Sequence, residues 1–369
     1  MDAIGLNNRA NRYSIYREIE KGDGDMKGAK ILKIALDDFG SFLSAEKGCL
    51  VVKDREGNAK RYPLGENSVG EIQLRSGNGV SVGALVYCAF WDVDVIVLTS
   101  RGNPVGVFHS FDNDSHVLTR VCQYEALKTD MALDIPKRIV LAKLKGQDEV
   151  LKKYGLRRHD YTVTEEIKNL EIDSLPKLQR SLNTIEGQES SKYFQQIFGL
   201  FPEYLRPRSR KGFKAYDKLN NLLNLGYSVL SWKVYLALVR AKLEPYLGFL
   251  HSLQFGKPSL VCDFEELYRY LIDDFVIQYA LSLREKDFVL KDESFTRNRK
   301  GKREYLNGAK NSEFLKMLSL FFRSKVEVPR IKVGKKQEIE TLIAEEALLF
   351  AKYLREEIAD WNPRLPNLK

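Results

Sequence analysis

Cysteine and histidine are scarce in this sequence. Its 369 residues include four cysteines and four histidines, and no two cysteines have the Cys-X-X-Cys spacing of a zinc module. The scattered cysteines do not indicate a disulfide framework, so we expect a reducing cytosol. The nucleophile elbow, the Walker loop and the dinucleotide fingerprint are also absent from the sequence. These absences argue against a covalent hydrolase, an ATPase and a dehydrogenase.

The sequence also lacks a long hydrophobic run. No apolar stretch approaches the roughly 20 residues that a membrane span requires. The most apolar helical segment, 227–239, is interrupted by Ser228, Ser231 and Lys233. No secretory signal opens the sequence. We therefore expect a soluble, cytoplasmic protein.

Charge, by contrast, is abundant. Lysine and arginine number 59, and aspartate and glutamate number 50, which gives a formal net charge of +9. Hydrophobic residues make up 44% of the chain, an ordinary share for a folded protein. A chain of this length can bury a full core and form two domains. The basic excess favours a polyanionic partner such as nucleic acid.

The first third of the sequence has the pattern of β-strands. Short apolar or alternating runs between turn residues predict strands at 31–36, 49–53, 71–74, 93–98 and 105–108. One helix is predicted among them, over 80–91, with Ser81 as its cap and an apolar face turned inward. That face would consist of Val82, Leu85, Val86 and Phe90.

Around residues 111–115 the hydrophobic period changes to that of helices. Helices are predicted at 117–132, from Pro136 onward, at 178–197, at 259–283 with Ser259 as cap, and at 338–357. We interpret 297–302 as a basic loop and 362–366 as a tail that is loose or docked on a partner. The predicted class is α+β, with a flexible extension at 1–28, a β-rich, sandwich-like domain at 29–112 and a larger all-α domain at 113–369.

Acidic residues close to cations mark one candidate site. Asp263 and Glu266 are three apart, so both project from one face of a helix. His251 precedes a Gly-Lys-Pro loop that can fold it back over these carboxylates, and an imidazole can complete a carboxylate site for a hard divalent cation. Lys257 and Arg269 place cations where a phosphate would lie. On spacing alone, a solvated acidic face and a histidine without a chemical role stay open as well.

Four blocks of the sequence, in order, resemble the CRISPR-associated endonuclease of the adaptation module, the integrase that inserts new spacers. The blocks are Asn-Thr-Ile-Glu-Gly at 183–187, the Asn-rich segment 218–230, Tyr-Leu-Gly-Phe-Leu-His at 246–251 and Asp-Phe-Glu-Glu-Leu-Tyr-Arg at 263–269. The resemblance extends over about residues 29–354. It links Glu186 to the other acids, which spacing could not do.

The resemblance implies a metal site and a reaction on DNA. Glu186, His251 and Glu266 would be ligands of Mg²⁺ or Mn²⁺, with Asp263 as a nearby acid of the catalytic group. The implied reaction is attack of a DNA 3′-hydroxyl on a phosphodiester, which inserts foreign DNA fragments into a CRISPR array. Cleavage of branched DNA by water is implied as well.

Residues around this site are expected to bind DNA or to support the ligands. In the loop 206–214, Arg208, Arg210 and Lys211 have no balancing acids and are candidates for contacts to the DNA backbone, although a solvated linker has the same composition. The resemblance alone suggests Asn220 and Tyr227 as supporting residues behind the ligands.

The resemblance also implies partners: spacer and repeat DNA, a homodimer joined through the β-rich domains, and a small ferredoxin-like adaptation protein. Two alternatives stay open. A transposon-encoded integrase relative is disfavoured because no helix-turn-helix signal follows Trp361. A catalytically silent DNA scaffold is disfavoured because all three implied ligands are present.

Overall fold

The computed structural model describes residues 32–36, 38–63, 69–91, 93–100, 102, 104–110, 117–212, 215–296, 299–327 and 336–368. The chain divides into two compact units. One contains the described residues up to Ile96 together with Val107–Ser110, and the other contains Val97–Gly106 and the described residues from 117 onward. The predicted extension at 1–28 and the predicted boundary at 112 lie outside the described residues.

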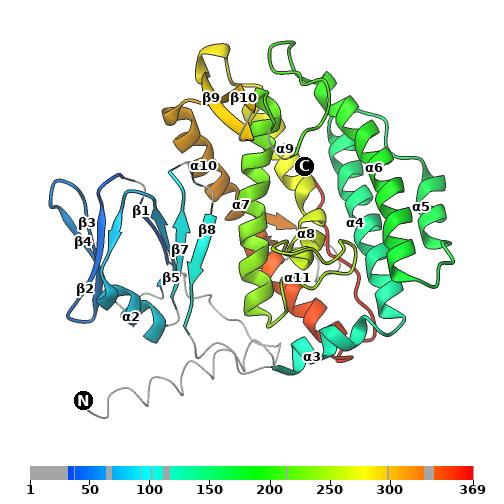
Figure 1. Ribbon diagram of the computed structural model, residues 1–369, viewed down its shortest axis with the longest axis horizontal. Helices are drawn as coiled ribbons and strands as arrows, with labels where there is room; N and C mark the ends of the chain where they lie inside the picture. The colour runs from blue at the N-terminus through cyan, green and yellow to red at the C-terminus, as the bar shows by residue number, and fades with distance from the viewer. Residues whose placement is uncertain are drawn as a thin grey trace. The chain divides into compact units, whose positions relative to one another are not determined.

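The β-rich part of the chain forms two four-stranded sheets (Figure 1). The first has the order β1-β5-β7-β8, from β1 (Leu32–Leu36), β5 (Val69–Arg75), β7 (Asp94–Leu98) and β8 (Pro104–Phe108). The second has the order β4-β3-β2-β6, from β4 (Ala59–Pro63), β3 (Cys49–Lys53), β2 (Phe42–Glu46) and β6 (Gly79–Val80). All five predicted strands are present. Strands β2, β4 and β6 were not predicted from the sequence. Strand β4 is mostly exposed and lacks an apolar alternation.

The predicted helix between these strands is confirmed, but its predicted buried face is wrong. In α2 (Val82–Phe90), Ser81 Oγ accepts a hydrogen bond of 3.1 Å from the Ala84 amide, as expected of an N-cap. The buried residues are Ala84 and Cys88, whose small side chains let the helix lie close to β2. Three of the four side chains predicted to face inward are instead exposed by more than half: Val82, Val86 and Phe90. The fourth, Leu85, is partly buried against the core.

The second unit is mostly helical, which confirms the predicted α+β class. Its helices are α3 (Val117–Ala126), α4 (Met131–Lys153), α5 (Tyr161–Lys168), α6 (Leu175–Gly199), α7 (Lys218–Arg240), α8 (Ser259–Glu266), α9 (Arg269–Ala280), α10 (Gly308–Phe322) and α11 (Ile339–Leu354). In Figure 1, α4 and α6 run side by side. The central helix α7 packs against α8, α9 and α11. A single apolar core joins these helices.

The central helix α7 is also long and apolar enough to cross a membrane, which the sequence analysis did not expect. Of its most apolar window, 61% is buried inside the unit. Burial of this kind is typical of a core helix, because the same apolar residues pack against the neighbouring helices.

Two predicted helices are each broken in two. The first break falls in 117–132: α3 ends at Ala126 and α4 begins at Met131, so Pro136 lies inside α4 and does not open it. The second falls in 259–283, where Tyr268 adopts φ −127° and ψ −1° between α8 and α9. This break places Glu266 and Arg269 at adjoining helix ends.

The start of α8 also differs from the prediction. Ser259 is the first residue of the helix and does not cap it. Its hydroxyl donates a hydrogen bond of 3.0 Å to the Ser252 carbonyl and so fastens the preceding loop to the helix. The last residue of α8 is Glu266, one of the predicted metal ligands.

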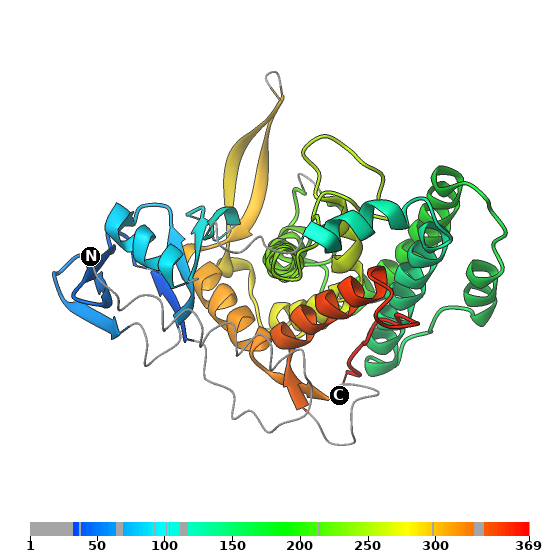
Figure 2. The ribbon, with the colours of Figure 1, turned by 90° about the horizontal axis from the view of Figure 1, so that it is seen from below.

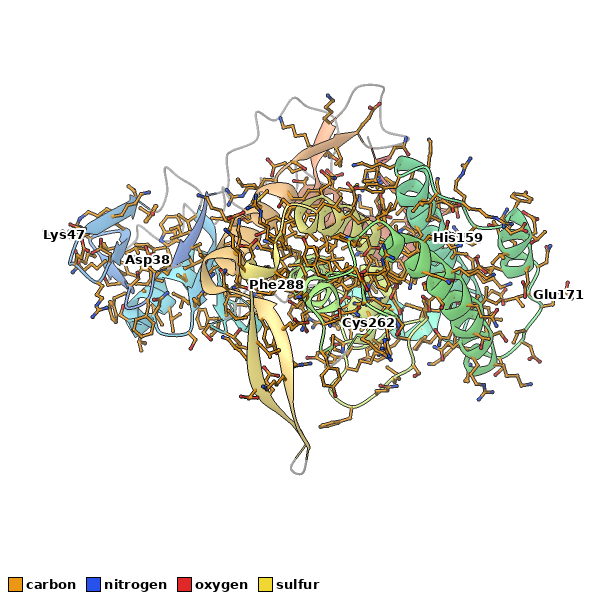
Figure 3. All side chains as sticks on the ribbon, turned by 90° about the horizontal axis from the view of Figure 1, so that it is seen from above. Asp38, Lys47, His159, Glu171, Cys262 and Phe288 are labelled. Atoms are coloured by element: carbon orange, nitrogen blue, oxygen red, sulfur yellow. The ribbon has the colours of Figure 1, made fainter. Side chains whose placement is uncertain are left out.

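The predicted basic loop at 297–302 is wrong for its described part. Strands β9 (Phe288–Thr296) and β10 (Arg299–Leu306) pair as an antiparallel hairpin, while residues 297 and 298 lie outside the described residues. The hairpin extends away from the helices of its unit (Figures 2 and 3). Its strands are rich in charge and lack an apolar alternation, so their pattern does not predict strands.

The C-terminal tail is docked on its own unit. Trp361 is 1% exposed, and the Tyr270 hydroxyl donates a hydrogen bond of 2.6 Å to the Pro366 carbonyl. Arg364 pairs with the buried Glu346 of α11 at 2.9 Å. A tail held by these contacts is neither loose nor in need of a partner.

Candidate functional site

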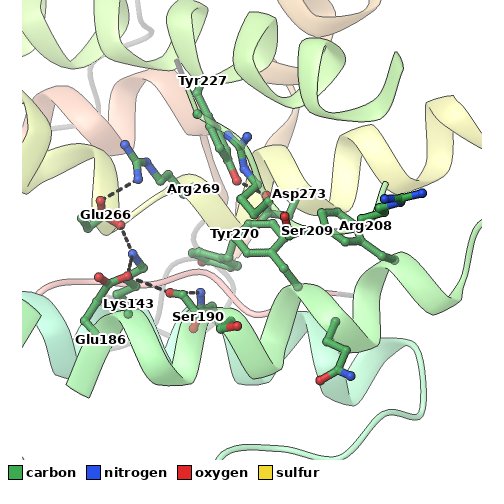
Figure 4. Close-up of a pocket in the computed structure, with 18 residues that line it drawn as sticks. Lys143, Glu186, Ser190, Arg208, Ser209, Tyr227, Glu266, Arg269, Tyr270 and Asp273 are labelled. Carbon is green, nitrogen blue, oxygen red and sulfur yellow. Dashed lines mark hydrogen bonds and ion pairs between the residues drawn. The ribbon is translucent and has the colours of Figure 1, made fainter. Parts of the chain in front are cut away.

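A pocket of about 640 Å³ opens in the helical unit, lined by α4, α6, the 206–212 loop, α7, α8 and α9. Figure 4 shows its two kinds of wall. One wall is acidic and carries Glu186 from α6 and Glu266 from α8. The other carries Arg208 and Arg210 from the loop, beside Tyr227 of α7. Segments distant in the sequence therefore bring acids and cations to one cavity.

The acidic wall is centred on a lysine that the sequence analysis did not single out. Lys143 of α4 forms an ion pair and a short hydrogen bond with Glu186 Oε1, and its Nζ lies 2.6 Å from Glu266 Oε2 (Figure 4). Ser190 donates a hydrogen bond of 2.7 Å to Glu186 Oε1, and Arg269 Nη1 lies 2.7 Å from Glu266 Oε1. Both acids therefore face one shared ammonium group.

Glu266 is ionised despite being deeply buried. Burial alone would raise the pKa of its carboxyl, but the charges of Arg269 and Lys143 outweigh burial and lower that pKa to about 2. The imidazole of His251 adds to this lowering. The neighbouring Glu265 behaves oppositely: burial raises its pKa, and Arg269 only partly offsets the rise.

His251 is fixed by Asp263. The backbone N–H groups of Phe249 and Leu250 donate to Asp263 Oδ2 at 2.6 and 3.0 Å, and the His251 N–H donates to Oδ1 at 2.9 Å. The His251 ring contacts the same Oδ1 through Nδ1 at 2.8 Å. Such a contact fixes the ring and leaves Nε2 as its ligating atom, as in carboxylate–histidine–metal groups. Asp263 has no exposed surface and no oxygen left for an ion.

Two glycines allow the elements of this wall to approach each other. A Cβ on Gly146 of α4 would lie 2.5 Å from the Tyr270 ring, so glycine lets α4 pack against the start of α9. A Cβ on Gly248 would lie 2.7 Å from the Ser259 carbonyl carbon and 2.8 Å from Asp263 Oδ2. Larger residues at these positions would push α4 and the His251 turn away from Glu266.

The basic wall is organised by the Asn-rich start of α7. Asn220 Oδ1 accepts hydrogen bonds from Arg210 Nη1 at 3.0 Å and from the Lys211 amide at 2.9 Å. Asn224 Oδ1 accepts a second Arg210 hydrogen bond at 2.7 Å, and Asn224 Nδ2 donates to the Gly212 carbonyl at 2.5 Å. These asparagines hold the loop against the helix and fix its arginine at the pocket.

Tyr227 lies between the two walls. The guanidinium groups of Arg210 and Arg269 are 5.2 and 5.1 Å from the centre of its ring, within cation–π distance. Its hydroxyl donates a short hydrogen bond to Asp273, which also accepts one of 2.9 Å from Tyr193. Burial raises the pKa of Asp273 to about 6, although these two hydroxyls act in the opposite direction.

Most of the predicted site residues meet at this pocket. Glu186, Glu266, Arg208, Arg210, Arg269 and Tyr227 line it. Asn220 and Asp263 lie behind it and hold the basic loop and the His251 turn. His251, Lys211 and Lys257 are not among the lining residues. His159, which has no part in the predicted site, is largely buried and contacts Glu189 Oε2 through Nδ1 at 2.8 Å.

Lys143 carried a signal that sequence reasoning missed. It lies in the same helical stripe as the buried residues Ile139, Val140 and Leu144 of α4. A lysine in an apolar stripe is almost never buried without a partner. The position of Lys143 therefore indicated that a buried acid lies elsewhere in the chain, but it did not identify that acid.

The chemistry of these residues fits a divalent cation. Within the described residues, no three His, Cys, Asp or Glu side chains already form a metal cluster, and Lys143 occupies the space between the two glutamates. A positive charge is thus already held where the acids converge. Glu266 Oε2 is buried and receives no well-directed hydrogen bond. Two carboxylates and a fixed imidazole are a donor set that suits Mg²⁺ or Mn²⁺.

Comparison with known proteins gives a family match. A family model described as CRISPR associated protein Cas1 matches residues 34–311. The CRISPR-associated endonuclease Cas1 2 of Pyrobaculum aerophilum is 31% identical over 270 residues, which cover 71% of this chain and 88% of that protein. The CRISPR-associated endonuclease Cas1 1 of Francisella tularensis subsp. novicida is 27% identical, covering 69% and 81%.

Solved structures share the fold at low sequence identity. A casposase bound to integration product is 21% identical with a TM-score of 0.74, covering 92% of this chain and 94% of that one. A Cas1 protein from Thermotoga maritima is 20% identical with a TM-score of 0.70, covering 88% and 97%. A chain of a Cas6-RT-Cas1–Cas2 complex is 18% identical with a TM-score of 0.69, covering 95% and 38%.

Proposed function

Because the chain belongs to the CRISPR-associated Cas1 family of endonucleases and integrases, we propose that it is a metal-dependent DNA integrase. Its reaction joins a DNA 3′-hydroxyl to a phosphodiester and so inserts foreign DNA fragments as new spacers in a CRISPR array. Water in place of the hydroxyl gives cleavage of branched DNA. One observation supports this most: acids from α6 and α8 converge on one cation, and Asp263 of the same α8 fixes the His251 imidazole.

Glu186, Glu266 and His251 are the residues that would hold Mg²⁺ or Mn²⁺. When bound, the ion supplies a Lewis acid for the scissile phosphate and the leaving oxygen. The chain's own contribution is to fix these donors in advance. Asp263 holds the His251 ring, and Arg269 holds the Glu266 carboxylate. Preorganised groups of this kind need no costly rearrangement during the reaction.

The basic wall of the pocket would receive the DNA backbone. Arg210 is held by two asparagines and Arg208 is exposed, so both can neutralise phosphates without reading sequence. Arg269 is already shared by two glutamates, and its role would be to hold Glu266 as the phosphate approaches. Lys211 and Lys257, outside the pocket lining, would contact only flanking DNA.

The proposed reaction requires partners. Complexes containing Cas1 and Cas2 chains and a casposase bound to integration product share this fold. By analogy we include a small ferredoxin-like adaptation protein, spacer and repeat DNA, and a cytoplasmic setting. The exposed apolar face of α2, formed by Val82, Val86 and Phe90, supports a homodimer joined through the β-rich unit.

Strand transfer tests the proposal. A labelled oligonucleotide with a free 3′-hydroxyl is incubated with supercoiled plasmid and Mn²⁺ or Mg²⁺, and joined product is measured. We expect Glu186→Gln to reduce the rate at least about 1000-fold, since loss of a metal ligand removes several kcal/mol of transition-state stabilisation. The exposed Glu171→Gln variant is the matched control and should keep wild-type activity.

The same assay separates the two alternatives. A plasmid with a CRISPR leader and repeat is compared with a plasmid that carries a transposon-type target. Preference for the transposon target would indicate the transposon-type integrase that the casposase likeness raises. Wild type that binds DNA but forms no joined product with either metal would leave only a DNA-binding scaffold. Equal, metal-independent product with wild type and Glu186→Gln would contradict the proposed role of Glu186.

A further inference from the structure

Lys143 is the least expected charged residue of the pocket. It is 7% exposed, and its ammonium group contacts Glu186 and Glu266, which lie on different helices. Among the described interactions, no other cation contacts both acids. A buried lysine without acids would lose its charge, and buried acids without a cation would take up protons. The three groups are therefore held together by charge.

Each of the two acids has a further partner that does not depend on Lys143. Ser190 donates a hydrogen bond to Glu186 at 2.7 Å, and Gln147 donates to Ser190 at 3.2 Å. Arg269 holds the second oxygen of Glu266 at 2.7 Å. The carboxylates would therefore keep their places if Lys143 moved away.

Lys143 and Glu266 attract each other by charge, but their contact does not have good hydrogen-bond geometry. The distance is 2.6 Å, yet Glu266 Oε2 receives no well-directed hydrogen bond and has no exposed surface. An oxygen in this state is poorly satisfied by an ammonium group. A divalent cation, which needs lone pairs and not a particular N–H direction, would satisfy it better.

We propose that Lys143 is an internal counter-cation that competes with the divalent metal for Glu186 and Glu266. Metal binding then requires the ammonium group to leave the space between the acids, and its flexible stem allows it to turn into the pocket. Lys143 thereby sets the metal affinity of the site. This inference rests on the proposed function, because it concerns the same metal site.

Metal binding to the purified full-length protein tests the inference. Mn²⁺ affinity is measured by electron paramagnetic resonance titration for wild type, Lys143→Met and Lys145→Met. Lys145 is an exposed lysine of the same helix and serves as the control. We expect Lys143→Met to bind Mn²⁺ about tenfold more tightly or better, since its competitor is gone. The melting temperature in EDTA should fall in this variant alone.

The two measurements distinguish competition from a purely structural role. A structural lysine would lower the melting temperature but would not tighten Mn²⁺ binding. Unchanged or weaker Mn²⁺ binding by folded Lys143→Met would overturn the inference. If that variant does not fold, Lys143→Arg carries the test: it keeps the charge and should bind Mn²⁺ no better than wild type, and tighter binding would overturn the inference.

Failure of the proposed function gives a different result. In that case wild type itself would show no saturable Mn²⁺ site that Glu186→Gln abolishes. If wild type binds and transfers strands but Lys143→Met shows no gain in affinity, the integrase proposal stands and only the competition is rejected.

Discussion

Asp263 and Glu266 lie one helical turn apart on α8, are equally hidden from solvent, and are held in opposite ways. The oxygens of Asp263 accept three backbone N–H groups of the 249–251 turn and contact the His251 ring. In the part of the chain that the structure describes, the oxygens of Glu266 pair with the side-chain cations Lys143 and Arg269. Backbone donors cannot leave without local unfolding, whereas side chains can turn away. The first acid therefore builds the site, and the second is available to an exchangeable cation.

The largest expected effect is on stability at Asp263. Asp263→Asn replaces a carboxylate, whose two oxygens both accept hydrogen bonds, by an amide with a single acceptor oxygen. It also places the amide N–H₂ group next to backbone N–H groups, which are themselves donors. We expect a loss of about 3–5 kcal/mol in the free energy of unfolding, measured by urea denaturation, as for other broken buried charge contacts. A loss below about 1 kcal/mol would show that the turn is held by other contacts.

The matching change at Glu266 should affect activity more than stability. We expect Glu266→Gln to reduce the rate of strand transfer at least about 1000-fold, equivalent to about 4 kcal/mol, while costing less than half the stability lost in Asp263→Asn. The rate comes from the plasmid assay and the stability from the same urea series. Equal stability losses in both variants would remove the contrast between the two acids.

Asp273 offers a third acid, held by hydroxyls alone. Its pKa is raised from 3.8 to about 6, so the folded protein binds its proton more tightly than the unfolded chain. The stability that this proton contributes is complete below about pH 3.8 and is lost as the pH rises through about 6. In the Asp273→Asn variant the asparagine side chain does not titrate in this pH range, so this dependence on pH is absent. Between about pH 3.5 and pH 7 the variant's stability should rise by about 3 kcal/mol relative to wild type.

Urea denaturation at several pH values, compared between wild type and Asp273→Asn, checks this expectation. A difference that is independent of pH over that range would mean that Asp273 titrates normally. An opposite slope would mean that the cations of the pocket, Arg210 and Arg269, dominate its charge state.

The smallest expected effect concerns the basic wall. Asn224→Ala removes an acceptor from Arg210 and a donor to the Gly212 carbonyl. We expect about tenfold weaker DNA binding and a decrease of about 1 in the slope of log Kd against log salt, because one phosphate contact is lost. Fluorescence anisotropy at several salt concentrations measures both. Asn169→Ala, at an exposed position at the end of α5, is the matched control, and an equal slope change there would mean that the pocket lining does not define the DNA path.

The sequence predicted the acids of the site better than their partners. The helical spacing of Asp263 and Glu266 was readable, and the resemblance added Glu186, but nothing local tied Lys143 to acids that follow it by 43 residues and more. The spacing also could not separate a structural acid from an available one. That difference depends on Gly248, which brings the 249–251 turn against α8.

Fold prediction failed where pattern and packing disagree. The inward face predicted for α2 used its largest apolar residues, whereas close packing selected Ala84 and Cys88. The β9–β10 hairpin is too charged to show an apolar alternation. No proline or glycine marks the break between α8 and α9 at Tyr268. That break nevertheless places the charges of Glu266 and Arg269 at adjoining helix ends.

Electron spin-echo spectroscopy of bound Mn²⁺ tests most directly whether Glu186, Glu266 and His251 share one ion. Nitrogen-14 modulation from a coordinated imidazole should be present in wild type and absent in His251→Gln. His109, whose Nδ1 lies 2.7 Å from Asp94 in the same kind of pair, is the control, and His109→Gln should keep the signal. Identical nitrogen modulation in wild type and His251→Gln, or Mn²⁺ binding unaffected by Glu186→Gln and Glu266→Gln, would contradict the proposed metal site.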